Sequence, residues 1–401
     1  MANGELPDGW EALPFDECVL APLERRRSVQ QNAYAASGTY PVVDQGEGMI
    51  AGYTDDPSAV YRDSLPMILF GDHTRNIKYL DFPFATGADG TKLFIARPGK
   101  LEPKYLYFAL RALDIPSRGY NRHFKYLREQ IILAPQDMSE QETIAGVLSK
   151  LQRAVEAQDK IIATLKDLKA ATLAKLFREG LRGEPLKETE IGEIPESWEV
   201  VPLRQVTASS AFGPRFSAGL YSQDGNIATL RTTDINEDGH INYSSMPKAT
   251  LQMEKFKAHV LSESDLLITR SGTCGIAAVF ASQPIPVLPG AFLIRVRLTA
   301  AMVPHILRLW INSPIGRSHI QQLAAGAVQQ NISGTRLAGL LIPLPKEKDQ
   351  VQIAATLMTI EKKLEECEGK RDILRVLFST SLHLLMAGEV RVTPLMNGAL
   401  S

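Results

Sequence analysis

LPDGWEALPF, at residues 6–15, returns as IPESWEVVPL at residues 194–203. Both segments read P-x-x-W-E-x-x-P. A second matching pair lies further along, IILAPQDMSEQETIAGVL at residues 131–148 and LLIPLPKEKDQVQIAATL at residues 340–357. Self-similarity at a wide spacing is the signature of a repeated architecture. The chain is therefore predicted to hold two copies of one unit, whose ends match and whose middles differ.

A long helix is predicted at the end of each copy. Steps of four and three residues from Ile144 to Leu176 visit ten positions, of which seven are apolar, and the same steps from Ile353 to Leu385 visit eight apolar positions in ten if cysteine is counted. This period predicts two coiled-coil seams. Proline stands just before both helices and glycine just after them, as at helix ends. Two amphipathic helices packed separately on a core are the alternative, but the matched registers favour mutual pairing.

The middles of the two copies contain short β-prone runs between turn residues. They are TYPVVDQG, SLPMILFGD and KLFIARPG in the first copy, and NIATLRTTD, SDLLITRSG and GAFLIRVRL in the second. These runs indicate α/β or mainly β modules, and together with the long helices they predict an α+β chain. A linker is expected where glycine and proline gather among charged residues. The predicted boundaries are 1–137 for the first module, 138–180 for the first helix, 181–193 for the linker, 194–345 for the second module, 346–390 for the second helix and 391–401 for a tail.

Composition describes an ordinary globular protein. The 401 residues are 44% hydrophobic, and 44 Lys+Arg stand against 45 Asp+Glu, which argues against disorder and against a strongly basic surface. The three cysteines, Cys18, Cys274 and Cys367, form no CxxC pair, so neither a disulfide framework nor a zinc site of standard spacing is expected. We expect a reducing, cytoplasmic compartment, with no exported or membrane-inserted segment.

Motifs for catalysis are missing from the sequence. It contains no GxxxxGK[ST], HExxH or GxSxG, no paired carboxylates at an acid/base spacing, and no Asn-Pro-Pro-aromatic tetrapeptide of an amino-methylating enzyme. Gly46-Glu-Gly48 resembles the start of a nucleotide-binding turn, but the segment after it does not read as a helix, so a plain turn is favoured. We predict no catalytic residue, no metal site and no cofactor in this chain.

Loop segments that mix basic, amide and aromatic side chains remain, and such side chains contact phosphates and base edges. The clearest pair ends the two middles, RGYNRHFKYLREQ and GAVQQNISGTRLAG. We expect the basic side chains of the first to bind phosphate, Asn121 to read an adenine edge, and Arg336 of the second to contact guanine or phosphate. A solvated loop or, for each arginine, a surface salt bridge is the alternative. The predicted DNA-binding residues are Arg75, Asn121, Arg122, His123, Lys125, Arg128, Arg215, Tyr221, Arg231, Thr232, Arg270, Ser271, Gln329, Gln330, Asn331 and Arg336.

In the order of these motifs the chain resembles a specificity subunit of type I restriction-modification systems. The likeness covers nearly all of it: the PDGWE and PESWE openings, YPVVDQGEGMIAGY and ILFGDHTRNIKYLDFPFATGADG in the first copy, LRTTDI and LLITRSGTCG in the second, and the proline-rich entry to each long helix, IPLP-x4-Q in the second copy. The resemblance implies two target recognition domains in a tandem pseudo-repeat, with conserved helices that pair antiparallel as a spacer. Ala134, where the second copy has Pro343-Leu344, and the tail after Val392 depart from the pattern.

The resemblance also implies a function and partners. Each domain would read one half of an asymmetric, bipartite site in double-stranded DNA. Two methyltransferase subunits would bind S-adenosylmethionine and methylate adenine N6, and a restriction subunit using ATP and Mg would cut unmethylated DNA, while this chain supplies no chemistry. Two alternatives stay open. One is a scaffold that does not read sequence, and the other is a stand-alone DNA methyltransferase or nuclease.

Overall fold

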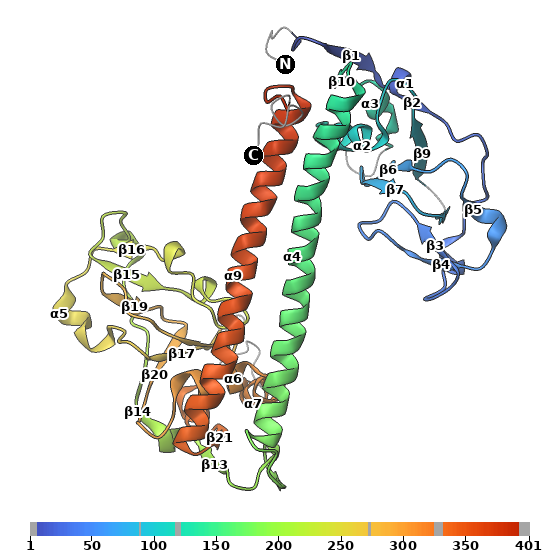
Figure 1. The fold of residues 1–401 in the computed structure, drawn as a ribbon. Coiled ribbons are helices and arrows are strands. Elements are labelled where there is room, and N and C mark those ends of the chain that lie inside the picture. Colours follow the sequence, from blue (N-terminus) through green and yellow to red (C-terminus); the bar gives the residue numbers. More distant parts are fainter. Residues whose placement is uncertain (1–5, 88–89, 117–121, 272–273, 325–331, 393–401) are drawn as a thin grey trace, which may run out of the picture. The chain divides into compact units, whose positions relative to one another are not determined.

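The structure, a computed structural model, describes residues 6–87, 90–116, 122–271, 274–324 and 332–392 (Figure 1). Its contacts divide the chain into two compact units, residues 1–160 with 368–401, and residues 161–367. Two long helices, α4 (Met138–Glu179) and α9 (Glu347–Met386), each contribute residues to both units. Among the described residues, no helix has the length and apolar character needed to cross a bilayer.

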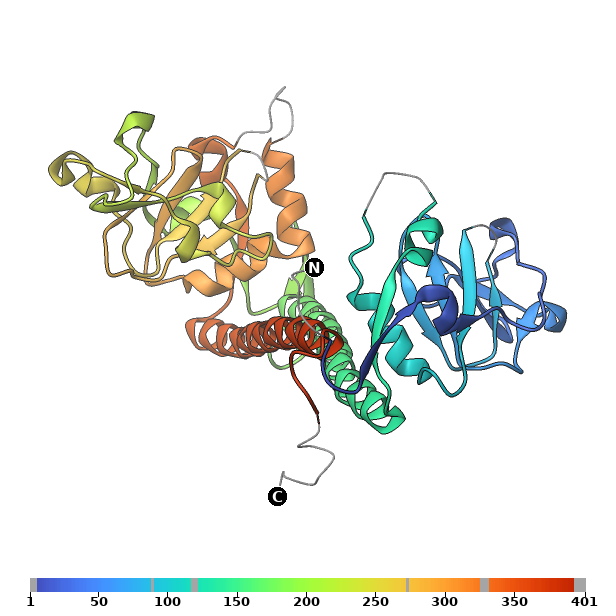
Figure 2. The same ribbon diagram turned by 90° about the horizontal axis from the view of Figure 1, so that it is seen from above.

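The first unit is built mainly from short strands. Its strands are β1 (Trp10–Pro14), β2 (Val19–Leu20), β3 (Tyr40–Val43), β4 (Gly52–Thr54), β5 (Val60–Tyr61), β6 (Met67–Gly71), β7 (Ile77–Leu80), β8 (Phe84–Thr86), β9 (Thr91–Ala96) and β10 (Ile131–Pro135). Its short helices are α1 (Phe15–Cys18), α2 (Pro103–Ala112) and α3 (Phe124–Arg128), with 3-10 turns η1 (Gln31–Ala33) and η2 (Pro57–Ala59). Figure 2 shows α2 between the strands and α4.

The second unit follows the same plan. Its strands are β11 (Leu186–Thr189), β12 (Gly192–Pro195), β13 (Glu199–Pro202), β14 (Thr207–Phe212), β15 (Ile227–Leu230), β16 (Lys248–Ala249), β17 (Leu266–Thr269), β18 (Ala277–Val279), β19 (Val287–Pro289), β20 (Leu293–Leu298) and β21 (Leu341–Leu344). Its helices are α5 (Met253–Phe256), α6 (Pro304–Asn312), α7 (Pro314–Ala324) and α8 (Gly334–Ala338). Its 3-10 turns are η3 (Leu203–Val206), η4 (Ala218–Leu220), η5 (Thr232–Asp234), η6 (Tyr243–Ser245) and η7 (Lys257–His259).

Strand order recurs between the units. The first has a sheet β2-β9-β6-β7 and the second a sheet β14-β20-β17-β18, and in each the third strand along is a fully buried run. Beside it, β3 pairs in parallel with β8, and β15 pairs in parallel with β19. The six β-prone runs predicted from the sequence are all present as strands. The α+β prediction is confirmed.

The repeated sequence motifs have matching places in the fold. The opening W-E-x-x-P segments form β1 and β13, which pair with β10 and β21, the strands just before the long helices. The glutamine at the start of each long helix is buried and holds two turns together. Gln141 Nε2 donates to the carbonyl of Pro135 and its Oε1 accepts from the amide of Glu102; Gln350 makes the same pair of bonds to Pro345 and Val303. The amides of Glu102 and Val303 belong to the N-caps of α2 and α6, where the start of a helix leaves backbone N–H groups unpaired.

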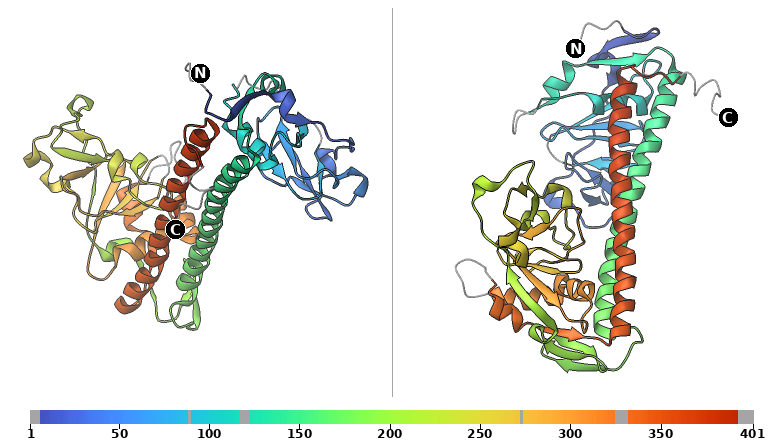
Figure 3. Two further views of the ribbon diagram at one scale, coloured as in Figure 1. Left: turned by 45° about the horizontal axis from the view of Figure 1, so that its top comes forward. Right: turned by 90° about the vertical axis from the view of Figure 1, so that its left-hand side faces the viewer.

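The long helices pack together within each unit (Figure 3). In the second unit Ile162 of α4 clusters with Leu364 and Cys367 of α9, and Lys169 meets Glu361, so residue numbers fall along α9 as they rise along α4. Most seam positions predicted from the period are buried or half-buried. Near the end of α4 the contact moves to Leu173 and Phe177, because that end packs on Trp198, whose ring lies 6.3 Å from Phe177.

The segment predicted as a linker, 181–193, is structured instead. Strands β11 and β12 form an antiparallel hairpin across it. Ile191 and Ile194 are 4% and 3% exposed in the core beside Trp198. The prediction followed glycine, proline and charge, whereas two isoleucines are enough to anchor a hairpin on an apolar surface.

Candidate nucleic-acid interface

In the first unit, four of the predicted residues gather around α3. Arg122, Lys125 and Arg128 line a hollow of about 500 Å³, together with Lys92 from the start of β9. Lys92 is absent from the sequence prediction, because a lysine at a strand start is an ordinary surface residue until the fold brings it to three others. Its ammonium lies 5.6 Å from the centre of the Phe124 ring. Four cations therefore lie around one opening, together with the acidic residues Asp16, Asp72 and Glu129.

Acidic side chains also line this hollow, and one of them pairs with Arg128. Arg128 is paired with Asp16 through two hydrogen bonds, from Nε to Oδ1 at 3.0 Å and from Nη2 to Oδ2 at 2.5 Å. That hydrogen bonding lowers the pKa of the Asp16 carboxyl. Arg122 and Lys125, by contrast, make no side-chain hydrogen bond or ion pair with the rest of the described chain. They are the cations best placed to meet a phosphate.

The position of His123 does not fit the predicted phosphate contact. Its side chain is 1% exposed, and its amide donates to the carbonyl of Asp72 at 2.8 Å, with Nδ1 3.0 Å from the same oxygen. Asp72 Oδ1 then accepts from the amide of Phe124. His123 therefore joins the loop after β6 to the start of α3, and it lies where DNA has no access. The sequence shows a basic cluster but not which member faces inward.

The loop after β6 carries Arg75 and is held by a residue that sequence reasoning missed. Arg75 adopts a φ of 63°, the left-handed region, and its Nη1 donates to the carbonyl of Ile115 at 2.8 Å. Gln45 Oε1 accepts from the amide of His73, and the Gln45 carbonyl accepts from Thr74 Oγ1 at 2.6 Å. Gln45 thus fixes the turn that presents Arg75. The only signal for Gln45 in the sequence is its place near the end of the β-prone run TYPVVDQG.

In the second unit, Arg231 is engaged in a salt bridge. Its Nε and Nη2 donate to the two oxygens of Asp234 at 3.1 and 2.7 Å, and Nη2 also donates to the carbonyl of Ser245. Burial acts to raise the pKa of Asp234, but the hydrogen bonds from Arg231 and Ser245 outweigh it and the net pKa lies below its ordinary value. For Arg231 the alternative of a salt bridge is therefore the observed one. Thr232 begins the 3-10 turn that this pair closes.

The other predicted residues of the second unit lie on separate loops. Arg215 and Tyr221 are exposed, and the Tyr221 ring stands 5.4 Å from Phe216. Arg270 directly follows β17, with its guanidinium carbon 4.3 Å from the centre of the Phe212 ring, and Ser271 comes next. Arg336, in α8, donates from Nη1 to the carbonyl of Leu323 at 2.9 Å. Asn121, Gln329, Gln330 and Asn331 lie outside the described residues.

The backbone around these sites matches between the units. In the first, the amide of Asp72 donates to Gly90 and the amide of His123 donates to Asp72. In the second, the amide of Arg270 donates to Phe292 and the amide of Ile332 donates to Arg270. Asp72 and Arg270 therefore occupy equivalent positions, as do Gly90 and Phe292. The same backbone arrangement therefore carries different side chains at equivalent positions of the two units.

Among the described residues, histidine, cysteine and carboxylate side chains do not gather in threes anywhere. Cys18, Cys274 and Cys367 are free thiols, and burial raises the pKa of the Cys18 thiol to about 12. A thiol with a raised pKa is a poor nucleophile and a poor metal ligand.

Comparison with known proteins bears on the whole chain. Residues 195–374 match the family model described as the type I restriction modification DNA specificity domain. The chain is 26% identical to the putative type I restriction enzyme MjaX specificity subunit of Methanocaldococcus jannaschii, across 97% of this chain and 95% of that protein. It is 25% identical to the type I restriction enzyme EcoR124I/EcoR124II specificity subunit of Escherichia coli, across 88% of this chain and 87% of that protein.

A solved structure shares the fold. The S subunit of a type I restriction-modification system from M. genitalium superposes with a TM-score of 0.66 at 15% identity, covering 96% of this chain and 97% of that one. At this identity the superposition speaks for the fold alone. Together, the family match and the relatives confirm the resemblance predicted from the motif order.

Proposed function

We propose, on the premise that this chain is a specificity subunit of the type I restriction-modification family, that it reads an asymmetric, two-part site in double-stranded DNA. Its two modules, 1–137 and 194–345, act as tandem target recognition domains. Helices α4 and α9 form the antiparallel coiled coil between them. Each module reads one half of the site.

One observation carries this proposal: equivalent backbone positions hold unlike side chains. Asp72 and Gly90 of the first unit stand where the second unit has Arg270 and Phe292. A scaffold of two copies has no reason to vary chemistry at one matched pair of loops. Because sequence is read by side chains at base edges, unlike side chains on like frames predict unlike half-sites.

The charge of the chain predicts how it binds. Counterion release from phosphates supplies much of the affinity of DNA-binding proteins, and a net charge of -1 provides little of it. We therefore expect weak DNA binding by the isolated chain and tight, salt-sensitive binding by its complex with two methyltransferase subunits, which would share the phosphate contacts. Nanomolar affinity of the lone chain at physiological salt contradicts this expectation.

The chemistry is expected to reside in the partners. In this proposal the methyltransferase subunits bind S-adenosylmethionine and methylate adenine N6, and a restriction subunit binds ATP and Mg. The isolated chain should bind no S-adenosylmethionine. Together with these subunits, it should act in the cytoplasm. An S-adenosylmethionine titration of the purified chain separates this reading from a stand-alone methyltransferase, for which saturable binding is required.

The deciding experiment is a methylation map. The chain is expressed with its methyltransferase in a host free of DNA methylation, and modified adenines are located by single-molecule sequencing. A two-part motif with a constant gap, lost when this chain is omitted, is expected. A second arm exchanges residues 20–125 for those of a relative, which should change one half of the motif and leave the other. A soluble, associated complex with no motif supports a scaffold instead.

A further inference from the structure

Two phenylalanines of the second unit are exposed beside an arginine. Phe292 is 55% exposed and Phe212 is 41% exposed. The guanidinium carbon of Arg270 lies 4.3 Å from the centre of the Phe212 ring. Large exposed aromatic side chains are uncommon on a monomer and mark binding surfaces when they gather.

The sheet places the three side chains at one end of three adjacent strands. β20 lies between β14 and β17 (Figure 1). Phe212, the last residue of β14, is opposite Ile294, and so diagonal to Phe292. The amide of Arg270 donates to the carbonyl of Phe292 at 3.0 Å, which continues the pairing of β17 with β20. Opposite and diagonal residues on one face of a sheet are within reach of aromatic side chains.

Glycine locks the two loops that carry the rings. A Cβ on Gly213 would lie 2.0 Å from the carbonyl oxygen of Gly290, so only glycine permits this approach. The amide of Gly213 donates to Leu293, and the amide of Gly290 donates to Leu230 at 2.7 Å. The backbone beside Phe212 and Phe292 is thereby fixed from both sides. Exposed rings on a fixed frame are preorganised for a partner.

The fold does not require an aromatic side chain here. The first unit has Gly90 at the position of Phe292 and Asp72 at that of Arg270, with the same backbone hydrogen bonds. An exposed ring also contributes little to the core of its own unit. The phenylalanine is therefore better explained by what it contacts than by what it supports.

We propose that Phe292 is an apolar wedge that inserts at a base step of the half-site read by the second unit, with Phe212 and Arg270 as its support. This inference rests on the proposed DNA-reading function and deepens it. Apolar side chains such as phenylalanine enter between base pairs and partly unstack them. A base face also stacks on an aromatic ring whatever its sequence. The stacked Arg270 brings positive charge to the same point, where phosphates are close.

The test uses the complex of the full chain with its methyltransferase and a duplex that carries the mapped site. 2-Aminopurine replaces one base at a time in the half-site that changes when residues 194–345 are exchanged. Wild type should brighten the probe at one step, and Phe292→Ala should abolish that signal and weaken binding about 10- to 100-fold. Phe292→Leu should keep part of both. Leu23→Ala, which removes a 93% exposed leucine from the first unit, is the control and should match wild type.

The outcomes separate the inference from the function it rests on. Wild type that binds the site specifically, with Phe292→Ala bound equally well or with the probe still bright, overturns the wedge. Affinity lost on replacing thymine by deoxyuridine, with no brightening at any step, also overturns it, because the ring then contacts a methyl group in the groove. Wild type without sequence-specific binding refutes the proposed function itself. Equal melting temperatures of the variants show that folding is intact.

Discussion

The two units differ most where α2 and α6 meet the long helices. In the second unit, Arg308 of α6 pairs with Glu361 of α9, and Lys169 of α4 reaches the same carboxylate at 3.0 Å. Arg308 and Glu361 are 5% and 6% exposed. At the corresponding place in the first unit, the Tyr107 hydroxyl meets Gln152 Oε1 at 3.4 Å. The same backbone arrangement thus accepts a buried ion pair in one copy and a tyrosine with a glutamine at the corresponding positions in the other.

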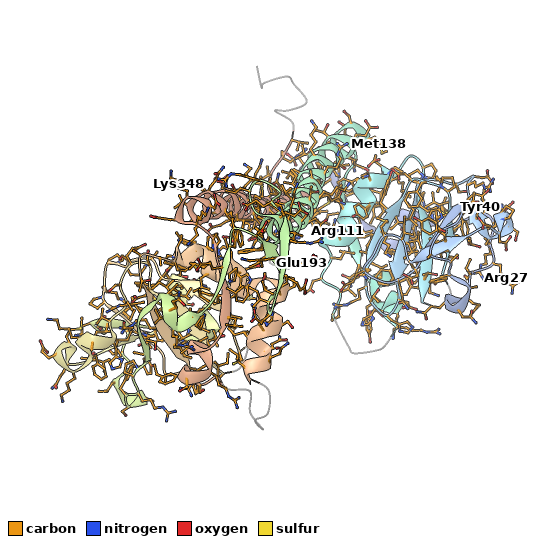
Figure 4. The ribbon with its side chains drawn as sticks, turned by 90° about the horizontal axis from the view of Figure 1, so that it is seen from below. Arg27, Tyr40, Arg111, Met138, Glu193 and Lys348 are labelled. Atoms are coloured by element: carbon orange, nitrogen blue, oxygen red, sulfur yellow. The ribbon has the colours of Figure 1, made fainter. Side chains whose placement is uncertain are left out.

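In the first unit, an arginine near the surface completes this contact. Arg111, labelled in Figure 4 beside the long helices, donates from Nη1 to the Tyr107 hydroxyl at 3.0 Å and to Gln152 at 3.2 Å. Its guanidinium carbon also lies 5.1 Å from the centre of the Phe378 ring. Phe378 is the residue of α9 that corresponds to Lys169 of α4 in the second unit. The comparison shows that the fold demands matched partners at this contact rather than particular charges.

Breaking the ionic network should have the largest effect. Glu361→Ala leaves Arg308 buried without its carboxylate, and we expect the free energy of unfolding of the second unit to fall by about 3–5 kcal/mol. Gln152→Ala, the matched change in the first unit, should cost about 1 kcal/mol. Urea unfolding of each variant measures both. The double change Arg308→Met with Glu361→Leu should recover much of the loss, and equal costs for Glu361→Ala and Gln152→Ala would contradict the comparison.

The next largest effect is expected at low pH, where the second unit should lose stability through Glu361. Burial acts to raise the pKa of Glu361, but the hydrogen bond and charge of Arg308 and the charge of Lys169 outweigh it, so the folded pKa lies below the ordinary value of 4.5. A lowered folded pKa gives stability that is full above the ordinary value and is lost as the pH falls through the folded value. Unfolding measured from about pH 6 to pH 3 should show this loss in wild type. Glu361→Gln should flatten that part of the curve, and an unchanged curve would exclude Glu361 as its source.

The phosphate contacts give a smaller, site-specific contrast. Arg122→Ala and Lys125→Ala should each lower the slope of log affinity against log salt by about 1 in the methyltransferase complex, and should weaken the first half-site alone. Arg215→Ala removes an exposed arginine of the second unit and serves as the comparison there. Fluorescence anisotropy on duplexes with one half-site scrambled assigns each effect. Equal losses at both half-sites would overturn the division of labour.

The smallest contrast concerns the two ends of the long helices. Arg391 is bidentate to Glu140 at 2.8 and 2.9 Å and donates to the carbonyl of Asp8, whereas Arg182 makes one contact of 3.1 Å with Asp349. Paired donors on a carboxylate bind more strongly than one. Arg391→Ala should therefore cost about 1 kcal/mol and Arg182→Ala less. Thermal unfolding at low and high salt measures the difference, and a larger effect of Arg182→Ala would reverse the ranking.

Local patterns in the sequence were enough to predict most of the longer strands and both long helices. The buried runs of β6 and β17, the seam of α9 and the left-handed glycines Gly180 and Gly388 at φ of 65° and 70° were all predicted from period, composition and turn residues. These features depend on neighbours within a few positions. The hairpin at 186–195 was missed, because it packs in one core with Phe177 of α4, a contact that glycine, proline and charge in the local sequence do not reveal.

Less of the candidate site than of the fold could be predicted from the sequence. Basic loop residues are visible in the sequence, but whether a side chain faces solvent, as Arg122 does, or turns inward, as His123 does, depends on a loop far away that supplies its partner. Lys92 and Gln45 lie at the ends of β-prone runs, and nothing local marks either residue as part of a site. Phe292 reads as one more apolar residue of a strand, and its exposure became visible only when β20 was placed between its neighbours.

The sequence by itself determined the repeat, the strands, the two helical seams and the resemblance to a family, because all of these depend on spacing along the chain. Only the tertiary structure decided which charged groups pair with each other and which remain at the surface. The physical reason is that burial and pairing are set by groups brought together from distant segments. Arg308 lies 53 residues from Glu361 and Arg128 lies 112 residues from Asp16, and it is the fold that turns each into a contact.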